Sequence, residues 1–278
     1  MRKLLAVLLL ISVLSADFIL ESATITISNI QADGSATVRE SIKFIASGNN
    51  SRTTYDNGYD TDANLSYWSI NTALKDVKIH TNTMKASITD FRLTPQPAKG
   101  CSPFLNTCHG ELIIDYNIKP LYNYSGDGSL VVVPGTGLFK VEKYKPRVVR
   151  YSINPDVLSF RETGSGSLLL DPEVYLTIDF PKDSYFSQLP NPTPTEMSGK
   201  VPGYVSKLTW NDLILVKFSL VFEVEESIDK EVVSFFRDII TSFQKIINSS
   251  NGLPLIIILG ILIGTYIYVN IAKIKRED

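Results

Sequence analysis

Two cysteines close together are the most specific chemical feature of this sequence. Cys101 and Cys108 are the only cysteines of the chain and stand in the segment CSPFLNTC. Outside the cytoplasm, cysteines at this spacing are expected to form a disulfide that closes a small loop. A structural zinc site needs four ligands, and His109 is the only further candidate close by. We therefore expect a disulfide, and we expect no bound metal or cofactor.

Catalytic chemistry is poorly supported by the remaining residues. The chain has two histidines, His80 and His109, and neither belongs to a motif such as GxSxG or HExxH. His80 lies in DVKIHTNT, whose alternating pattern predicts a half-buried strand residue. The partners of a Ser-His-Asp arrangement converge only in the fold, so sequence alone leaves a hydrolase open. We assign no catalytic residue.

A short acidic segment resembles the first part of a calcium-binding loop. Asp60, Asp62 and Asn64 have the spacing of the first three ligands of such a loop. The match then fails, because Leu65 replaces the required glycine and Asn71 replaces the bidentate glutamate. The segment is therefore either an irregular calcium loop or a solvated turn.

Two further surface features could bind ligands or carry modifications. The segment KVEKYKPRVVR would place Lys143, Lys145 and Arg147 on one face of a strand. Such a strand either binds an acidic glycan or lipid head group, or is an edge strand that its charges protect from aggregation. N-x-S/T sequons are candidate glycosylation sites in an exported chain, and here they begin at Asn49, Asn64, Asn123 and Asn248.

An antiparallel β-domain is expected to position these residues. Apolar and polar residues alternate in many segments between residues 18 and 225, which is typical of strands with one buried face. The pair Asp33-Gly34 predicts a hairpin turn. We predict an all-β domain over residues 17–225, built as one enlarged antiparallel β-sandwich or as two with a boundary near residues 120–150. Irregular, exposed segments are expected at residues 48–66 and 189–203.

The two ends of the chain predict export and a single membrane anchor. Residues 1–16 carry a basic start followed by a short apolar run, as a cleavable signal peptide does. Residues 253–272 are predominantly apolar over a length that spans the ~30 Å hydrocarbon core. The basic tail, residues 273–278, follows directly and by the positive-inside rule lies in the cytoplasm. The expected location is the cell membrane, with the N-terminal domain outside.

Assembly elements are expected beside and within this anchor. Residues 226–250 contain an amphipathic helix, whose apolar face would pack beneath the β-domain, on the membrane surface or against a partner helix. Gly260 and Gly264 form a GxxxG motif, a spacing that lets two membrane helices approach closely. The bilayer is the expected partner, and self-association or other envelope proteins would be engaged through residues 228–268.

The beginning of the β-domain resembles a group of known sequences. The segment ITISNIQADGSATVRESIKF carries the pattern DGS-x-x-V-x-E at Asp33, Gly34, Ser35, Val38 and Glu40. It is similar to the start of uncharacterised prokaryotic membrane proteins in which an outer β-sandwich is followed by a membrane anchor. The resemblance covers a small part of the chain, implies a surface domain and transfers no functional residue. The short tail and the sequons would also fit an archaeal surface protein.

Together these features favour a surface protein without enzymatic activity. We expect a membrane-anchored binding or adhesion module, or an accessory subunit of an envelope complex. The alternative is an envelope hydrolase or a carbohydrate-processing enzyme whose site forms only in the fold. The formal net charge of the chain is −2, and a mildly acidic domain is poorly suited to bind nucleic acid.

Overall fold

The structure is a computed structural model that describes residues 17–126, 128–145, 147–164 and 167–225, together with Arg237, Ile240 and Thr241. The chain divides into two compact units, Met1–Glu225 and Glu226–Asp278. The fold described below is that of the first unit, starting at Asp17.

Several expectations concern residues outside this description. The signal peptide, the membrane span, the basic tail, Asn248, Gly260 and Gly264 all lie there. The expected juxtamembrane helix lies there too, apart from Arg237, Ile240 and Thr241, whose backbone is helical. Within the described part of the chain, no helix is long and apolar enough to cross a membrane.

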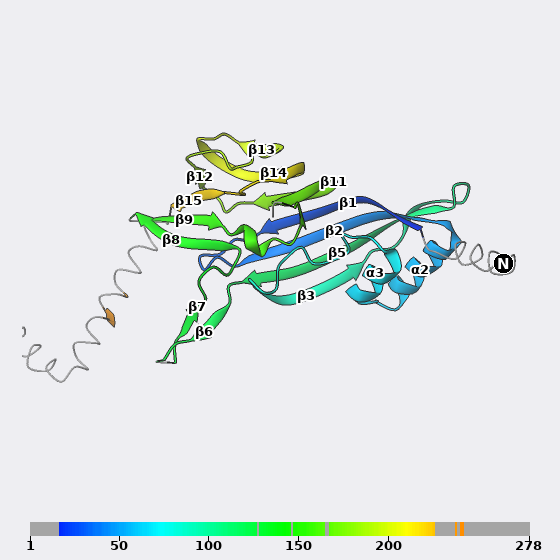
Figure 1. Ribbon diagram of the computed structural model, residues 1–278, viewed down its shortest axis with the longest axis horizontal. Helices are drawn as coiled ribbons and strands as arrows, with labels where there is room; N and C mark the ends of the chain where they lie inside the picture. Colours follow the sequence, from blue (N-terminus) through cyan, green and yellow to red (C-terminus); the bar gives the residue numbers. More distant parts are fainter. Residues whose placement is uncertain are drawn as a thin grey trace, which may run out of the picture. The chain divides into compact units, whose positions relative to one another are not determined.

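The first unit consists mainly of β-strands, which confirms the predicted all-β class (Figure 1). Its elements in chain order are β1 Asp17–Ser28, β2 Ala36–Ser47, α2 Gly48–Asp60, α3 Leu65–Thr72, β3 Ser87–Pro95, β4 Lys99–Ser102, β5 Thr107–Lys119, β6 Tyr122–Tyr124, β7 Leu130–Val132, β8 Phe139–Lys145, β9 Val148–Ile153, a 3-10 turn Pro155–Val157, β10 Arg161–Glu162, β11 Leu168–Asp179, β12 Ser184–Phe186, β13 Glu196–Gly199, β14 Gly203–Leu215 and β15 Val221–Glu225.

The main sheet has 13 strands, and its principal path follows the order β3-β5-β2-β1-β11-β14-β12-β15-β9-β8. Strands β4, β10 and β13 pair beside this path, and β6 and β7 form a separate two-stranded sheet. Between the described strands, every pairing is antiparallel except β1–β11, which is parallel. The sequence left open a division into two sandwiches near residues 120–150. Strand β1 precedes these residues and β11 follows them, and the two strands pair within one sheet.

The β1–β2 hairpin forms at the turn that Asp33-Gly34 predicts. Asp33 Oδ1 accepts hydrogen bonds from the backbone N–H of Ser35 at 2.9 Å and from its hydroxyl at 2.6 Å. Gly34 has a φ of +82°, and a Cβ built there would lie 2.3 Å from the carbonyl oxygen of Phe139 in β8. Glycine is therefore required both for the turn and for the close approach of β8.

The interpretation of residues 48–66 as irregular was wrong, because two helices, α2 and α3, form between β2 and β3. Asparagine, glycine and threonine have low helix propensity, so packing must support these helices. The ring centroids of Tyr55 and Trp68 lie 5.3 Å apart, and both side chains are buried. Gly58 allows this contact, since a Cβ there would lie 2.7 Å from the Trp68 ring.

Two strand boundaries also differ from the sequence pattern. Apolar and polar residues alternate over residues 216–224 as in a single strand, but β15 begins only at Val221 because the chain turns at Lys217, whose φ is +49°. The segment 189–203, expected to be a loop, contains the short exposed strand β13.

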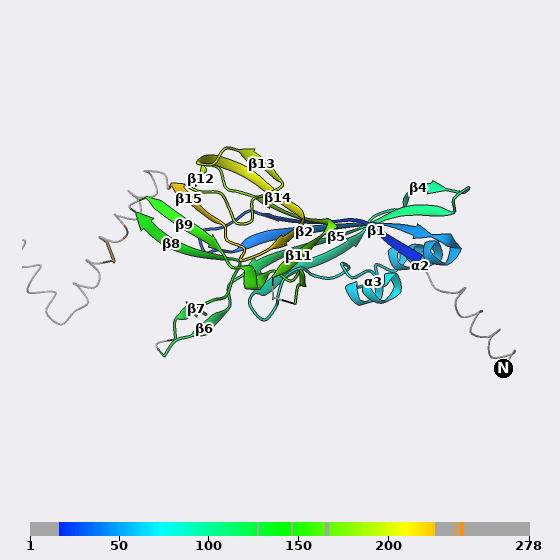
Figure 2. The same cartoon turned by 45° about the horizontal axis from the view of Figure 1, so that its top comes forward.

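The two ends of the first unit carry different loops. The hairpins β6–β7 and β8–β9 lie toward the end of the unit at which β15 finishes, in both views (Figures 1 and 2). Helix α2 and strand β4 lie at the opposite end, where the described chain begins at Asp17 (Figures 1 and 2). The two ends of the unit therefore present different secondary-structure elements to a ligand or partner.

Candidate functional site

A cluster of polar side chains lies within the apolar core, and we call Glu40, His80, Thr81 and Tyr116 the buried polar centre. Glu40 is 0% exposed and His80 is 1% exposed. Buried ionisable groups are rare unless they are paired. The buried polar centre is therefore the first candidate for a functional site.

Strand alternation explains why Glu40 and Tyr116 point inward. Val38, Glu40, Ile42 and Phe44 occupy alternate positions of β2 and are all buried. In β5, Tyr116 belongs to the matching buried series, and it lies opposite Val38 in the antiparallel register. Two residues along the strand from Val38, the Glu40 carboxylate is thus brought beside the Tyr116 phenol.

His80 and Thr81 come from the segment between α3 and β3, which lies over this part of the sheet. The expectation that His80 occupies a half-buried strand was wrong, since Thr81 makes only an isolated bridge to Leu158 and His80 is completely buried. The backbone N–H of Ser159 donates to the His80 carbonyl at 2.9 Å, and the Phe160 ring lies 5.3 Å from the imidazole.

The centre is held by short hydrogen bonds to one carboxylate. Glu40 Oε1 accepts from the backbone N–H of His80 at 2.8 Å and from the Tyr116 hydroxyl at 2.5 Å. Glu40 Oε2 lies 2.8 Å from His80 Nδ1. Thr81 Oγ1 lies 2.9 Å from the Tyr116 oxygen. Asp76 Oδ1 lies 3.7 Å from His80 Nε2, an ion-pair distance that is too long for a hydrogen bond.

These contacts determine how the groups titrate. Burial alone would lower the pKa of His80, but the charge of Glu40 and the contacts with Asp76 and Glu40 outweigh it, so the pKa is raised. Interaction with His80 lowers the pKa of Asp76. Burial, and then the charge of Glu40, raise the pKa of the Tyr116 phenol, which therefore remains neutral. The centre thus favours an imidazolium between two carboxylates.

This arrangement can hold the segment between α3 and β3 against the sheet. None of its residues lines the cavities of about 660, 470 and 400 Å³ in the described part of the chain. The sequence did contain a signal for the centre. Glu40 interrupts an otherwise apolar strand face, and such a carboxylate requires a partner.

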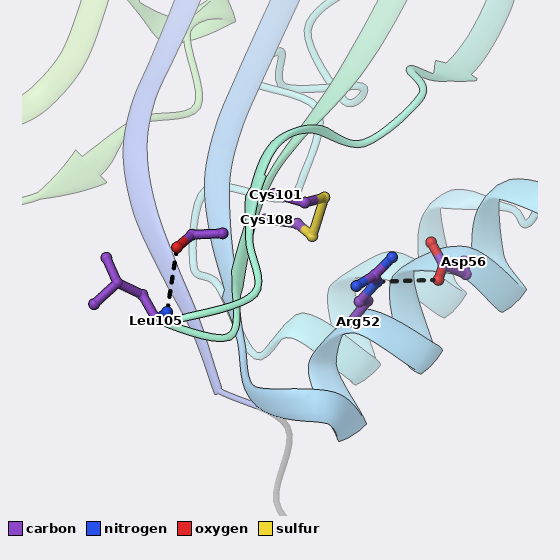
Figure 3. The surroundings of a disulfide bond; sticks show 6 residues. Arg52, Asp56, Cys101, Leu105 and Cys108 are labelled. Atoms are coloured by element: carbon purple, nitrogen blue, oxygen red, sulfur yellow. Dashed lines mark hydrogen bonds and ion pairs between the residues drawn. A yellow bond between two sulfur atoms is a disulfide. The ribbon is translucent and has the colours of Figure 1, made fainter.

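The disulfide between Cys101 and Cys108 is confirmed, with a Cα–Cα distance of 4.1 Å. It ties β4 to β5 and closes a loop, shown in Figure 3 beside helix α2. Phe104 is 95% exposed and Leu105 is 67% exposed at the end of this loop. In Figure 3 the Leu105 side chain points away from the disulfide. We call Phe104 and Leu105 the disulfide tip.

Two hydrogen bonds also hold the loop that carries the tip. The Ser102 hydroxyl accepts from the backbone N–H of Leu105 at 3.2 Å, and the Asn106 carbonyl accepts from the N–H of Gly48 at 2.8 Å. His109 follows directly, and its Nδ1 lies 2.9 Å from the Glu21 carboxylate. His109 of β5 is therefore paired with a glutamate of β1, which lies on the far side of β2 in the sheet.

The three residues of the candidate calcium loop belong to different local elements. Asp60 ends α2, Asp62 lies in a turn with a φ of +48°, and Asn64 caps α3. Asn64 Oδ1 accepts from the backbone N–H of Tyr67 at 3.0 Å. Across the described residues, no group of three or more His, Cys, Asp or Glu side chains could hold a metal ion.

The described sequon asparagines all lie on the surface, but in different structures. Asn49 lies in the first turn of α2, Asn64 caps α3 and Asn123 lies in β6. All three of these asparagines are exposed. The hydroxyl of Ser51, the third residue of the Asn49 sequon, is buried and donates to the Ser47 carbonyl at 2.6 Å. A glycan on Asn49 would therefore have to be added before this helix folds.

The basic segment forms strand β8 and the start of β9, and β8 is the last strand on the main path of the sheet. Arg150 donates to Glu223 at 2.6 Å, and its guanidinium lies 3.3 Å from the centre of the Tyr144 ring. Arg147 pairs with Glu225 at 2.9 Å. Strand β8 therefore lies at an edge of the sheet, and glutamates of β15 pair with Arg147 and Arg150. The expectation that Arg147 shares a strand face with Lys143 and Lys145 was wrong, because Arg147 lies in the turn before β9 with a φ of +65°.

Similarity to known proteins adds no further assignment of these residues. The sequence matches no protein-family model and no curated protein.

Proposed function

We propose that the chain is a single-pass membrane protein that presents an enlarged β-sandwich domain outside the cell. It acts without catalysis, as a binding or adhesion module or as an accessory subunit of an envelope complex. The Cys101–Cys108 bond supports an oxidising compartment, because disulfides persist mainly outside the cytoplasm. The apolar residues 253–272 and the basic tail support the anchor and its orientation.

The disulfide tip is the observation that carries the binding function. Phe104 and Leu105 expose large apolar side chains at the end of a loop that a disulfide and backbone hydrogen bonds hold in place. A loop that is already ordered loses little conformational entropy on binding. An exposed aromatic side chain on such a loop fits an apolar pocket of a partner protein, as binding hot spots do.

Site-specific photo-crosslinking in the native membrane tests this function. A photoreactive amino acid at position 104 should give defined adducts with another envelope protein. Ile70 in α3 provides the matched control, because it is also apolar and is 77% exposed but lies outside the tip. Adducts at position 104 and none at position 70 support the proposal. Equal labelling at the two positions, or none at either, contradicts it.

A separate measurement tests assembly within the membrane. The GxxxG motif at Gly260 and Gly264 would allow two copies of the anchor to pack closely. Replacing both glycines with isoleucine should reduce association of the full chain in a bilayer. If association is unchanged, self-association through this motif is excluded, and the function of the disulfide tip is unaffected.

The hydrolase alternative has weaker support. A hydrolase needs an open site, and Glu40, His80 and Tyr116 are sealed from solvent. A cavity of about 470 Å³ is open and polar, with Asp156 and Glu162 among its lining residues. If this cavity were catalytic, Asp156→Asn or Glu162→Gln would abolish a hydrolytic activity of the purified full chain. We expect no such activity to be found.

A further inference from the structure

The β6–β7 hairpin exposes an unusual number of apolar side chains. The hairpin forms its own two-stranded sheet, and its exposed residues include Tyr122, Tyr124, Leu130, Val131 and Val132. A two-stranded hairpin is at best marginally stable alone in water. A contiguous exposed apolar surface usually marks an interaction site. We therefore expect another surface to cover the apolar side chains of this hairpin in the functional state of the protein.

The apolar surface continues from the hairpin to strand β8. A cavity of about 660 Å³ lies beside the hairpin, and its lining includes Pro120 and Val133 next to the hairpin and Phe139 and Val141 of β8. Its charged lining residues are Lys140 and Asp33. The hairpin and β8 thus form one surface, which we call the apolar–basic end, comprising β6, β7 and β8.

Positive charge borders this surface, although the chain as a whole is slightly acidic. Residues 139–150 contain five basic residues and one acidic residue, a net of +4 (5 − 1). Glu142 pairs with Lys140, while Glu223 and Glu225 pair with Arg150 and Arg147. Lys143 and Lys145 are exposed and have no ion-pair partner among the described residues. They remain available to an external anion.

This combination of side chains matches the chemistry of a membrane surface. Tyrosine prefers the level of the lipid head groups, and aliphatic side chains enter the acyl boundary. Lysine side chains are attracted to anionic head groups. The end of the domain that carries β6–β7 and β8 is also the end where β15 finishes at Glu225 (Figures 1 and 2). From there the chain continues toward the expected anchor at residues 253–272.

We infer that the apolar–basic end docks on the outer leaflet of the membrane through anionic lipid head groups. The inference rests on the proposed function, since the anchor would hold the domain beside a bilayer. Lys143 and Lys145 contact lipid phosphates, and Tyr124 and Leu130 enter the interface. Docking would fix one end of the domain on the lipid and direct the disulfide tip, at the opposite end, away from it.

Depth-dependent fluorescence quenching tests this docking on the full chain. Tyr124→Trp and, as the matched control, Phe104→Trp each place one new indole on an exposed aromatic position. The full chain is mixed with vesicles of phosphatidylglycerol and phosphatidylcholine, with or without brominated acyl chains. The signal of the parent protein, from buried Trp68 and Trp210, is subtracted. The new indole at position 124 should be quenched by brominated lipid, and that at position 104 should not.

A charge-reversal pair provides the second arm. Lys143→Glu with Lys145→Glu should reduce quenching at position 124, whereas the same charge change at exposed Lys75 and Lys99 should leave it unaltered. Quenching that is equal in pure phosphatidylcholine overturns the role of anionic lipid. An indole at position 124 that brominated lipid leaves unquenched overturns docking, and if aqueous acrylamide also fails to quench it, a protein covers the surface instead.

The anchor is tested separately in the same samples. Resistance of the full chain to alkaline extraction reports insertion into the bilayer and does not depend on the hairpin. A chain that is extracted contradicts the proposed anchor, and quenching at position 124 still decides whether the apolar–basic end binds lipid. The two proposals can therefore fail independently.

Discussion

His80 Nδ1 and Glu40 Oε2 lie 2.8 Å apart, and both side chains are completely buried. The pair joins the segment between α3 and β3 to the inner face of the sheet, and the carboxylate also accepts from the backbone of His80. Removal of one partner would leave the other buried without compensation. Breaking a buried pair in this way typically costs about 3–5 kcal/mol.

We therefore expect Glu40→Ala to reduce the free energy of unfolding by about 3–5 kcal/mol. Arg39 and Asp115 supply a matched control, because Arg39 is the neighbouring residue on the opposite face of β2 and its ion pair is solvent-exposed. Arg39→Ala should cost at most about 1 kcal/mol. Denaturant titration, followed by fluorescence of Trp68 and Trp210, gives both values. Equal costs would show that the Glu40–His80 pair has no special role.

The double variant Glu40→Met with His80→Leu distinguishes the ionic interaction of the pair from the packing of its side chains. Buried ion pairs can often be replaced by apolar residues of similar volume at little cost. We expect the double variant to be more stable than the sum of the two single losses predicts. The backbone N–H at position 80 would lose its acceptor, so some loss of stability should remain. Strict additivity in the double-mutant cycle would rule out coupling between the two side chains.

The raised pKa of His80 predicts a pH dependence of stability. Because the folded pKa lies above the ordinary value of 6.5, the contribution of protonated His80 is fully present below about pH 6.5. It is lost as the pH rises through the folded pKa. The free energy of unfolding should therefore decrease over this range, and Glu40→Gln should flatten the decrease. An identical pH profile for both proteins would contradict this assignment.

The strand pattern was readable from the sequence because burial alternates along each strand. Val38, Ile42 and Phe44 mark the inner face of β2 without any knowledge of its neighbours. The same alternation identifies Glu40 as buried but cannot name its partner, since His80 is 40 residues away. Contacts between distant segments depend on how the sheet folds, and sequence periodicity carries no information about them.

Local composition misled where packing decides the structure. The segment that forms α2 is polar and rich in poor helix formers, so propensity favoured an irregular loop. Its few buried residues, Ser51, Tyr55 and Gly58, pack against the sheet and α3. The disulfide was predictable for the opposite reason, because its two cysteines are close in sequence and had no competing partner.

A pair of glycines with similar backbone angles tests the contact between the β1–β2 turn and β8. Gly34 and Gly48 have φ angles of +82° and +84°, but a Cβ would have neighbouring atoms within 4 Å only at Gly34. Each change to alanine should cost about 1 kcal/mol for the left-handed backbone. Gly34→Ala should cost a further ~1–3 kcal/mol, because its Cβ would collide with Phe139. Denaturant titration of the two variants gives both costs, and equal losses at the two positions would show that β8 moves away freely.

The disulfide should matter for the tip as well as for overall stability. In the chain-entropy description, closing a loop of this length contributes about 2–3 kcal/mol. Cys101→Ala with Cys108→Ala should therefore lower the free energy of unfolding by about that amount and speed amide exchange at Ser102 and at residues 104–107. Crosslinking from position 104 should weaken even though the sheet remains folded, because the tip would have to be ordered on binding. Reduction of the parent protein should reproduce these changes. If crosslinking persists at full strength after reduction, the disulfide is not what prepares the tip for binding.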